Sequence, residues 1–135
     1  MKKTWIAVIA ICLTIIAVVG ILFFIFGKSQ PLTIFINNQN KNQVSGEILF
    51  LDKIIEVPVI ASNTEQTQIV DISEIRKNSS KSKETGKIVF KYNINNTWNE
   101  VEIFGYVEPA DNYLYGKKAK VTIAEEGKAS VKFID

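Results

Sequence analysis

The apolar run from Thr4 to Phe26 constrains this chain most, because it holds twenty-three residues without a charge. At about 1.5 Å per residue, a helix of this length spans the roughly 30 Å hydrocarbon core of a bilayer. Lys2 and Lys3 precede the run, and only Lys28 follows it closely. This excess of N-terminal positive charge favours a cytoplasmic N-terminus and an exported C-terminal part. We therefore predict a single-pass protein of the cell membrane.

The main alternative is a cleaved signal peptide, whose apolar region is normally about 7–15 residues long and ends in small residues. Here the run is longer and closes with the bulky residues 23–26. We therefore favour an uncleaved signal anchor. The expected organisation is a cytoplasmic stub and transmembrane anchor over residues 1–27, a short tether over 28–31 and an extracytoplasmic domain over 32–135.

Composition limits what the exported part does. Its charges from residue 29 onward, 13 basic against 14 acidic, give a net charge of −1, which argues against nucleic acid as a partner. The sequence has no histidine, and its single cysteine, Cys12, lies in the apolar run. These absences exclude thiol and imidazole metal sites, Ser-His-Asp catalysis and disulfides in the exported domain. We expect no cofactor.

Alternation of apolar and polar residues predicts an all-β domain from residue 32 onward. The clearest strand covers 88–94, where Ile88, Phe90, Tyr92 and Ile94 share one face. Seven or eight short strands predict an immunoglobulin-like or transthyretin-like β-sandwich. The strands are expected at 32–36, 46–51, 54–60, 67–72, 88–94, 98–107, 119–124 and 129–134, with a turn at 125–128. The expected core is Ile34, Ile48, Phe50, Val57, Ile72, Ile88, Phe90, Tyr92, Ile103, Val121, Val131 and Phe133.

A polar segment over residues 76–87 is predicted to be a long mobile loop. Its five positive charges would suit an anionic lipid surface or an anionic wall polymer, at about 1 kcal/mol for each charge near a membrane. A solvated loop without a ligand is the simpler interpretation, and we favour it. The residues are Arg76, Lys77, Lys81, Lys83 and Lys87.

Aromatic and acidic residues cluster late in the chain. Glu100 and Glu102 share one face of a predicted strand, which would suit Ca²⁺ or a catalytic acid pair, although a solvated strand face is the favoured interpretation. Exposed aromatic side chains in the same region would form a partner-binding surface, whereas buried ones would belong to the core. The partner-binding candidates are Trp98, Phe104, Tyr106, Asp111, Tyr113 and Tyr115.

The stretches 68–75 and 103–108 and the terminal hairpin resemble small uncharacterised single-pass envelope proteins of Gram-positive bacteria. The resemblance implies an envelope location and supplies no catalytic residues. We expect a non-enzymatic module that binds another envelope or exported protein as an accessory subunit. The alternatives are an immunity protein that neutralises an exported toxin, a wall-polymer or ligand sensor, and a cell-surface enzyme. The oligomeric state stays open.

Small residues recur along one face of the predicted anchor, which would let a second helix approach closely, although alanine and glycine are also common in membrane helices that make no such contact. The small residues of this face are Ala7, Ala10, Thr14, Ala17 and Gly20. We predict that Ala10→Leu with Ala17→Leu weakens association of the full-length protein in membranes, measured by cross-linking. Association that stays at the wild-type level in this variant would show that the face makes no helix contact.

Overall fold

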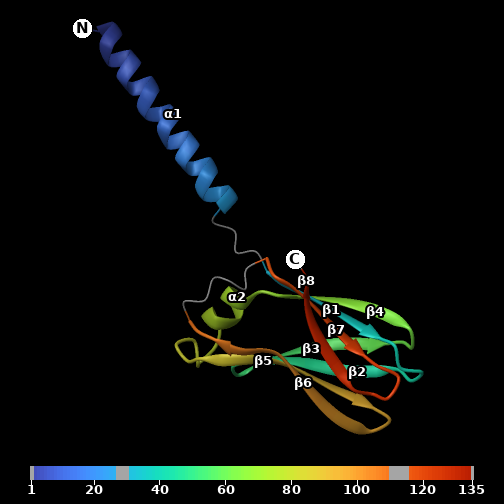
Figure 1. Ribbon diagram of the computed structural model, residues 1–135. Coiled ribbons are helices and arrows are strands. Elements are labelled where there is room, and N and C mark those ends of the chain that lie inside the picture. Colours follow the sequence, from blue (N-terminus) through green and yellow to red (C-terminus); the bar gives the residue numbers. More distant parts are fainter. Residues whose placement is uncertain (1, 27–30, 110–115, 135) are drawn as a thin grey trace.

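The computed structural model describes residues 2–26, 31–109 and 116–134, which form one long helix followed by a two-layered β domain (Figure 1). This arrangement confirms the predicted N-terminal helix and the β-sandwich architecture. The elements are α1 (Lys2–Phe26), β1 (Leu32–Asn38), β2 (Val44–Phe50), β3 (Lys53–Ile60), β4 (Thr64–Val70), α2 (Ile72–Lys77), β5 (Gly86–Ile94), β6 (Thr97–Val107), β7 (Lys118–Ile123) and β8 (Ala129–Ile134).

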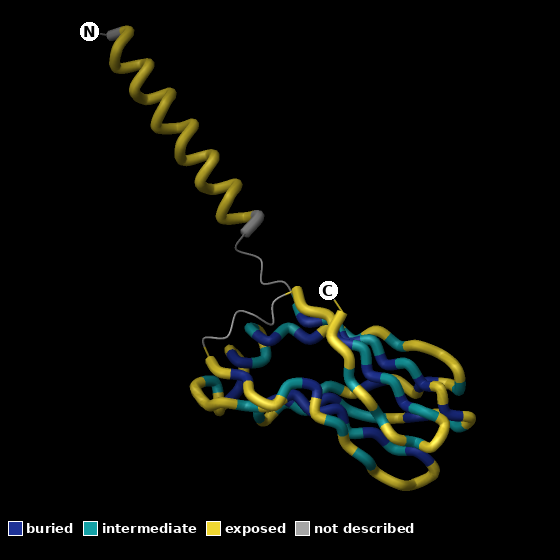
Figure 2. The backbone as a smooth tube through the Cα atoms, in the orientation of Figure 1, coloured by how far each residue is buried: buried dark blue, intermediate teal, exposed yellow. Residues whose placement is uncertain are grey.

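Helix α1 is long and apolar enough to cross a membrane, and its described side chains are exposed along its whole length (Figure 2). An exposed apolar helix at the N-terminus is consistent with a signal anchor or a signal sequence. Among its small residues, Thr14 Oγ1 donates a hydrogen bond to Ala10 O at 2.8 Å. This bond satisfies the hydroxyl within the helix, as apolar surroundings require.

The eight strands form two sheets of four. Sheet A has the order β4-β1-β7-β8, and sheet B has the order β3-β2-β5-β6. The pair β1–β7 is parallel, and the other neighbours are antiparallel. Inward side chains of both sheets form one core in which the large residues Phe50, Phe90 and Ile34 are almost fully buried. Two sheets that pack face to face bury their apolar inner faces in one shared core.

Two residues of the expected core are less buried than predicted, although Val131 still packs against the core. Val131 is only partly buried, and Phe133 is 50% exposed. Both belong to β8, which is the edge strand of sheet A. At this open rim Phe133 packs against Phe104 of β6 with ring centroids 4.8 Å apart. The prediction failed for Phe133 because alternation gives the face of a strand and not its distance from the sheet edge.

The strand register separates two ends of the domain. The entry end is the end at which Leu32 begins β1, and the far end is the end at which Asn38 closes it. The loops 39–43, 61–63, 95–96 and 124–128 join strands at the far end (Figure 1). The short turn after β2, helix α2 and the segment 78–85 lie at the entry end.

Two buried asparagines bind the far-end loops together. Asn38 Nδ2 donates to Asn42 O at 2.8 Å and to Ile60 O at 3.1 Å, and Asn38 Oδ1 accepts from the Asn40 N–H at 2.9 Å. Asn40 Nδ2 in turn donates to Glu125 O at 2.8 Å. Three separate loops are therefore held by two side chains whose amides satisfy otherwise orphaned backbone groups.

We predict that Asn38→Ala lowers the free energy of unfolding by about 3 kcal/mol, because it leaves several buried backbone groups unsatisfied. Urea unfolding followed by far-UV circular dichroism measures the effect. The exposed Gln43→Ala variant in the same loop serves as the control and should change stability by no more than about 0.5 kcal/mol. Equal stability of the two variants would contradict a structural role for Asn38.

Candidate functional site

The outer face of sheet B carries an apolar row that runs across three strands. Ile54 of β3 lies directly opposite Leu49 of β2, and Leu49 lies directly opposite Val89 of β5. Directly opposed residues point to the same face, with Cβ atoms about 5 Å apart. Ile54 is 62% exposed. An apolar row on the solvent side of a sheet departs from the polar-out alternation that a one-sided sheet normally shows.

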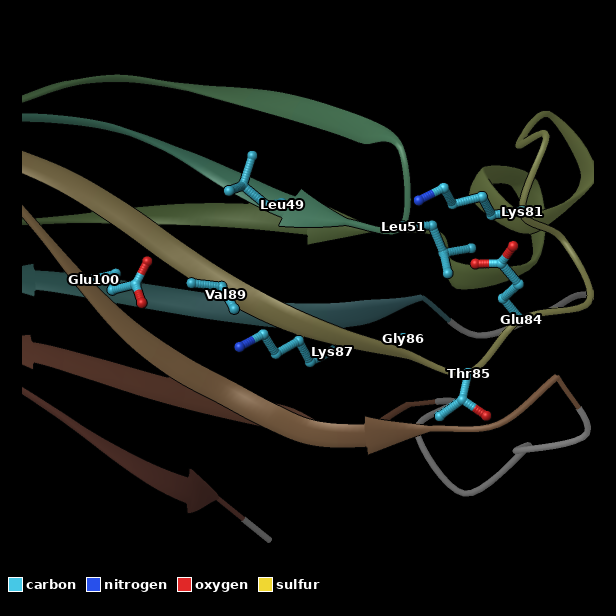
Figure 3. Close-up of a pocket in the computed structure, with 9 residues that line it drawn as sticks. All are labelled: Leu49, Leu51, Lys81, Glu84, Thr85, Gly86, Lys87, Val89 and Glu100. Atoms are coloured by element: carbon cyan, nitrogen blue, oxygen red, sulfur yellow. The ribbon is translucent and has the colours of Figure 1, made fainter.

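A groove of about 330 Å³ lies over this row at the entry end (Figure 3). Leu49, Leu51 and Val89 supply its apolar floor. The rest of its lining is polar or charged, with basic and acidic side chains on both sides: Lys81, Glu84, Thr85, Gly86, Lys87 and Glu100. Figure 3 shows Lys81 and Glu84 reaching the groove from the segment before β5, while Lys87 and Glu100 lie further along the sheet. The groove thus combines a hydrophobic floor with a rim that carries both positive and negative charges.

The Arg76 side chain holds the segment that forms one wall of the groove. Its Nη1 donates to Ser82 O at 3.1 Å and to Glu84 O at 2.8 Å, and its Nη2 donates to Val107 O at 2.8 Å. The guanidinium carbon lies 5.3 Å from the centroid of the Phe50 ring. The planar donor fork of arginine suits several carbonyls at once, which a lysine ammonium does not reproduce.

This arrangement corrects two predictions for the segment 76–87. Arg76 is buried, with 9% of its surface exposed, so it does not belong to an anionic-surface loop. The loop is also shorter than predicted, because residues 76–77 belong to α2 and residues 86–87 to β5, and the middle of the loop is tied to Arg76. Its charge and low complexity predict mobility, whereas the hydrogen bonds from Arg76 to the carbonyls of Ser82 and Glu84 favour an ordered backbone.

The remaining four basic residues of the segment are exposed at the entry end of the domain: Lys77, Lys81, Lys83 and Lys87. Lys87 Nζ lies 3.9 Å from a Glu102 carboxylate oxygen, and both side chains are more than half exposed. Such an exposed pair contributes little to stability. Contact of these lysines with an anionic surface stays a prediction.

A second set of contacts joins the same segment to Asp52, in the short turn after β2. The Ser79 and Ser80 hydroxyls both donate to the Asp52 carboxylate, the latter at 2.7 Å, and the Ser80 N–H donates at 3.2 Å. These donors, with the Ser79 hydroxyl first, hold the pKa of Asp52 well below its usual range. Hydrogen bonds to the ionised form stabilise the carboxylate and so lower its pKa.

Helix α2 was missed by the sequence analysis, which extended a strand to Ile72. Asp71 is the N-cap, and its carboxylate accepts from the Glu74 N–H at 3.0 Å. An aspartate three residues before a glutamate at the start of an apolar pattern is a helix-start signal. The signal was present in the sequence, but the β-branched residues before Asp71 outweighed it.

Gly86 lets the side chains of Leu51 and Phe50 pack closely against the start of β5. A Cβ atom at this position would lie 2.7 Å from Leu51 Cδ2 and 3.1 Å from Phe50 Cε2. A side chain at this first residue of β5 would displace the end of the Leu51 side chain, so glycine keeps Leu51 in its place at the groove. Sequence alone offers only a glycine at the start of a strand as a sign of such a close approach.

The predicted aromatic surface is not one patch. Trp98 and Tyr106 are both exposed, but they lie eight residues apart on β6, which corresponds to about 25 Å along a strand. Tyr106 donates to Glu108 Oε1 at 2.8 Å near the entry end, whereas Trp98 lies at the far end.

Phe104 lies on the inner side of sheet B, whereas strict alternation along β6 would place it on the same face as Glu100 and Glu102. Irregular register in β6 places Phe104 opposite the inward Ile88, while Glu102 lies opposite Val89 on the outer face. A bulge reverses the facing of the residues that follow it. Phe104 therefore packs against the core. Asp111, Tyr113 and Tyr115, the other partner-binding candidates, lie outside the described residues.

Among residues 2–26, 31–109 and 116–134, no three carboxylate or thiol side chains gather closely enough to hold a metal ion. In comparisons with known proteins, no family model matches the chain, and no curated protein matches it. An NMR structure of a protein from Eubacterium rectale aligns with 80% of this chain and 91% of its own length, at 14% sequence identity and a TM-score of 0.45.

We predict that acid destabilises the protein through Asp52. Its pKa is lowered in the folded state, so its contribution is present above the unfolded value of about 3.9 and is lost as the pH falls below that value. Asp52→Asn should therefore be less stable than the wild type at pH 7, and the difference should shrink below pH ~4. Urea unfolding as a function of pH measures it.

Glu56→Gln is the matched control, because the Glu56 carboxylate on β3 accepts no side-chain hydrogen bond from the described part of the chain. A stability difference between Asp52→Asn and the wild type that is independent of pH would show that the ionised Asp52 does not stabilise the segment.

Proposed function

We propose that this chain is a membrane-anchored, extracytoplasmic and non-enzymatic binding module that recognises a segment of another envelope or exported protein in the groove of sheet B. The observation that carries the proposal is the apolar floor of Leu49, Leu51 and Val89 within a rim of both charge signs. Val89 is 7% exposed, so the floor is a recessed apolar surface framed by polar residues, which is typical of binding pockets.

The dimensions of the groove define the kind of partner. A stable interface between two folded proteins buries roughly 1,600 Å² of surface. The groove, with a volume of about 330 Å³, is much smaller than such an interface and accommodates a few side chains of one segment. Full burial of one leucine or valine side chain contributes about 1.5–3 kcal/mol. Ile54 extends the apolar row from the groove to the edge strand β3, so an extended segment would gain contacts along the row.

The charged rim would select the partner more than it would strengthen binding. Lys81 and Lys87 stand with Glu84 and Glu100 around the floor. Rim charges mainly set the association rate and exclude partners of the wrong charge pattern. A partner segment with one apolar stretch flanked by both acidic and basic residues fits this rim.

The anchor would raise the effective concentration of the domain for partners in the same membrane. Confinement to one surface strengthens binding without a new contact. We therefore favour an accessory subunit of an envelope complex, with the N-terminus in the cytoplasm and the β domain outside. Because β1 and β2 lie in different sheets, unlike the first two strands of an immunoglobulin constant domain, we propose the transthyretin type of sandwich.

The test places a photo-reactive amino acid at Lys81 on the groove rim, in cells that make the full-length protein. We expect one discrete cross-linked protein, which disappears when Leu49→Lys puts a charge on the groove floor. The matched control places the same amino acid at Lys132, which is exposed on β8 of the other sheet. The proposal fails when Lys81 gives no product, or when both positions give the same products regardless of Leu49.

A further inference from the structure

A second pocket lies on sheet B at the far end of the domain, whereas the groove lies at the entry end. Its volume is about 310 Å³. Every side chain that lines it is a carboxamide or a hydroxyl: Asn42, Gln43, Ser45, Asn93, Asn95 and Asn96. The lining comes from the segment before and into β2, from the end of β5 and from the β5–β6 turn (Figure 1). These strands are neighbours, since Ser45 lies directly opposite Asn93.

The backbone that carries these side chains is fixed. Asn95 and Asn96 have φ values of 51° and 62° in the two-residue connection between β5 and β6. Two central residues with positive φ define the type I′ hairpin turn, whose twist matches that of the strands. On the opposite side, Asn42 donates from its backbone N–H to Asn40 Oδ1 at 2.9 Å. Binding of a ligand would therefore cost little conformational entropy in this part of the backbone.

Much of the hydrogen-bonding capacity of the pocket is unused. Within the described part of the chain, the side-chain amides of Gln43, Asn93 and Asn96 make no hydrogen bond to protein groups. Each carboxamide offers two N–H donors and one carbonyl acceptor. The fold has thus gathered several amides at one place and leaves them to water or to a ligand.

An aromatic platform borders the pocket. Trp98 lies directly opposite Asn93, so the three residues Ser45, Asn93 and Trp98 form one row across β2, β5 and β6. The Trp98 side chain is 55% exposed, and Lys91 Nζ lies 5.6 Å from its ring centroid. An indole ring held beside a polar pocket presents an apolar surface next to hydrogen-bonding groups.

We infer that this amide pocket, with Trp98 at its border, binds an uncharged saccharide. A sugar ring carries neighbouring hydroxyls that both donate and accept, which matches carboxamides, and C–H groups that pack on an aromatic ring. No charged residue lines the pocket, and the Lys91 ammonium beside it lies over the Trp98 ring, so a ligand held by the amides needs no charge. No apolar residue lines it either, so an apolar peptide side chain would gain little. The inference does not rest on the groove, which lies at the other end of sheet B.

The test uses the full-length chain in neutral lipid nanodiscs, with Trp5→Phe so that Trp98 is the reporting indole. Two uncharged probes, a glucose tetramer and an N-acetylglucosamine tetramer, are titrated to about 10 mM, a range that covers weak binding. We expect a saturable change in Trp98 fluorescence with at least one probe, and the two probes distinguish hydroxyl from acetamido chains.

Asn96→Gly removes one amide and keeps the turn, because glycine adopts positive φ without a steric penalty. We expect this variant and Asn93→Ala to bind at least about tenfold more weakly. Asn63→Gly is the matched control, since Asn63 also has positive φ at the far end and lies outside the pocket. The inference is overturned when neither probe gives a saturable change, or when Asn96→Gly binds as the wild type does.

Discussion

The Arg76 guanidinium is the contact on which the candidate groove depends. It joins helix α2, the segment before β5 and the end of β6 through carbonyls of Ser82, Glu84 and Val107, and it covers the ring of Phe50. Because this cation is buried, its cost is offset only when the surrounding carbonyls are in place. The arginine therefore requires the segment to be ordered, and the ordered segment forms a wall of the groove.

The two ends of sheet B differ in chemistry. The entry end combines leucine and valine side chains with lysine and glutamate, whereas the far end presents amides beside one indole. One sheet thus carries a surface suited to a protein segment and another suited to an uncharged polar ligand. The two surfaces lie apart because the strand register places the Leu49–Val89 pair and the Ser45–Asn93–Trp98 row at different positions along the strands.

The strands and the terminal hairpin were predictable because alternation and turn residues are local signals. Ile88 and Phe90 face the core as their spacing indicates, and Gly127 has positive φ in the expected turn. The site was less predictable, because its shape arises from long-range contacts. No local pattern reveals that Arg76 will be buried, or that a bulge turns Phe104 inward.

The most direct test of this account is the backbone mobility of residues 78–85, measured by ¹⁵N relaxation on the full-length protein in nanodiscs. A segment held by Arg76 should show order parameters near ~0.85, as in rigid backbone, and Arg76→Lys should lower them, because lysine cannot reproduce the donor fork. Order parameters below ~0.6 in the wild type would contradict the account, since a flexible segment could not form the wall of a groove.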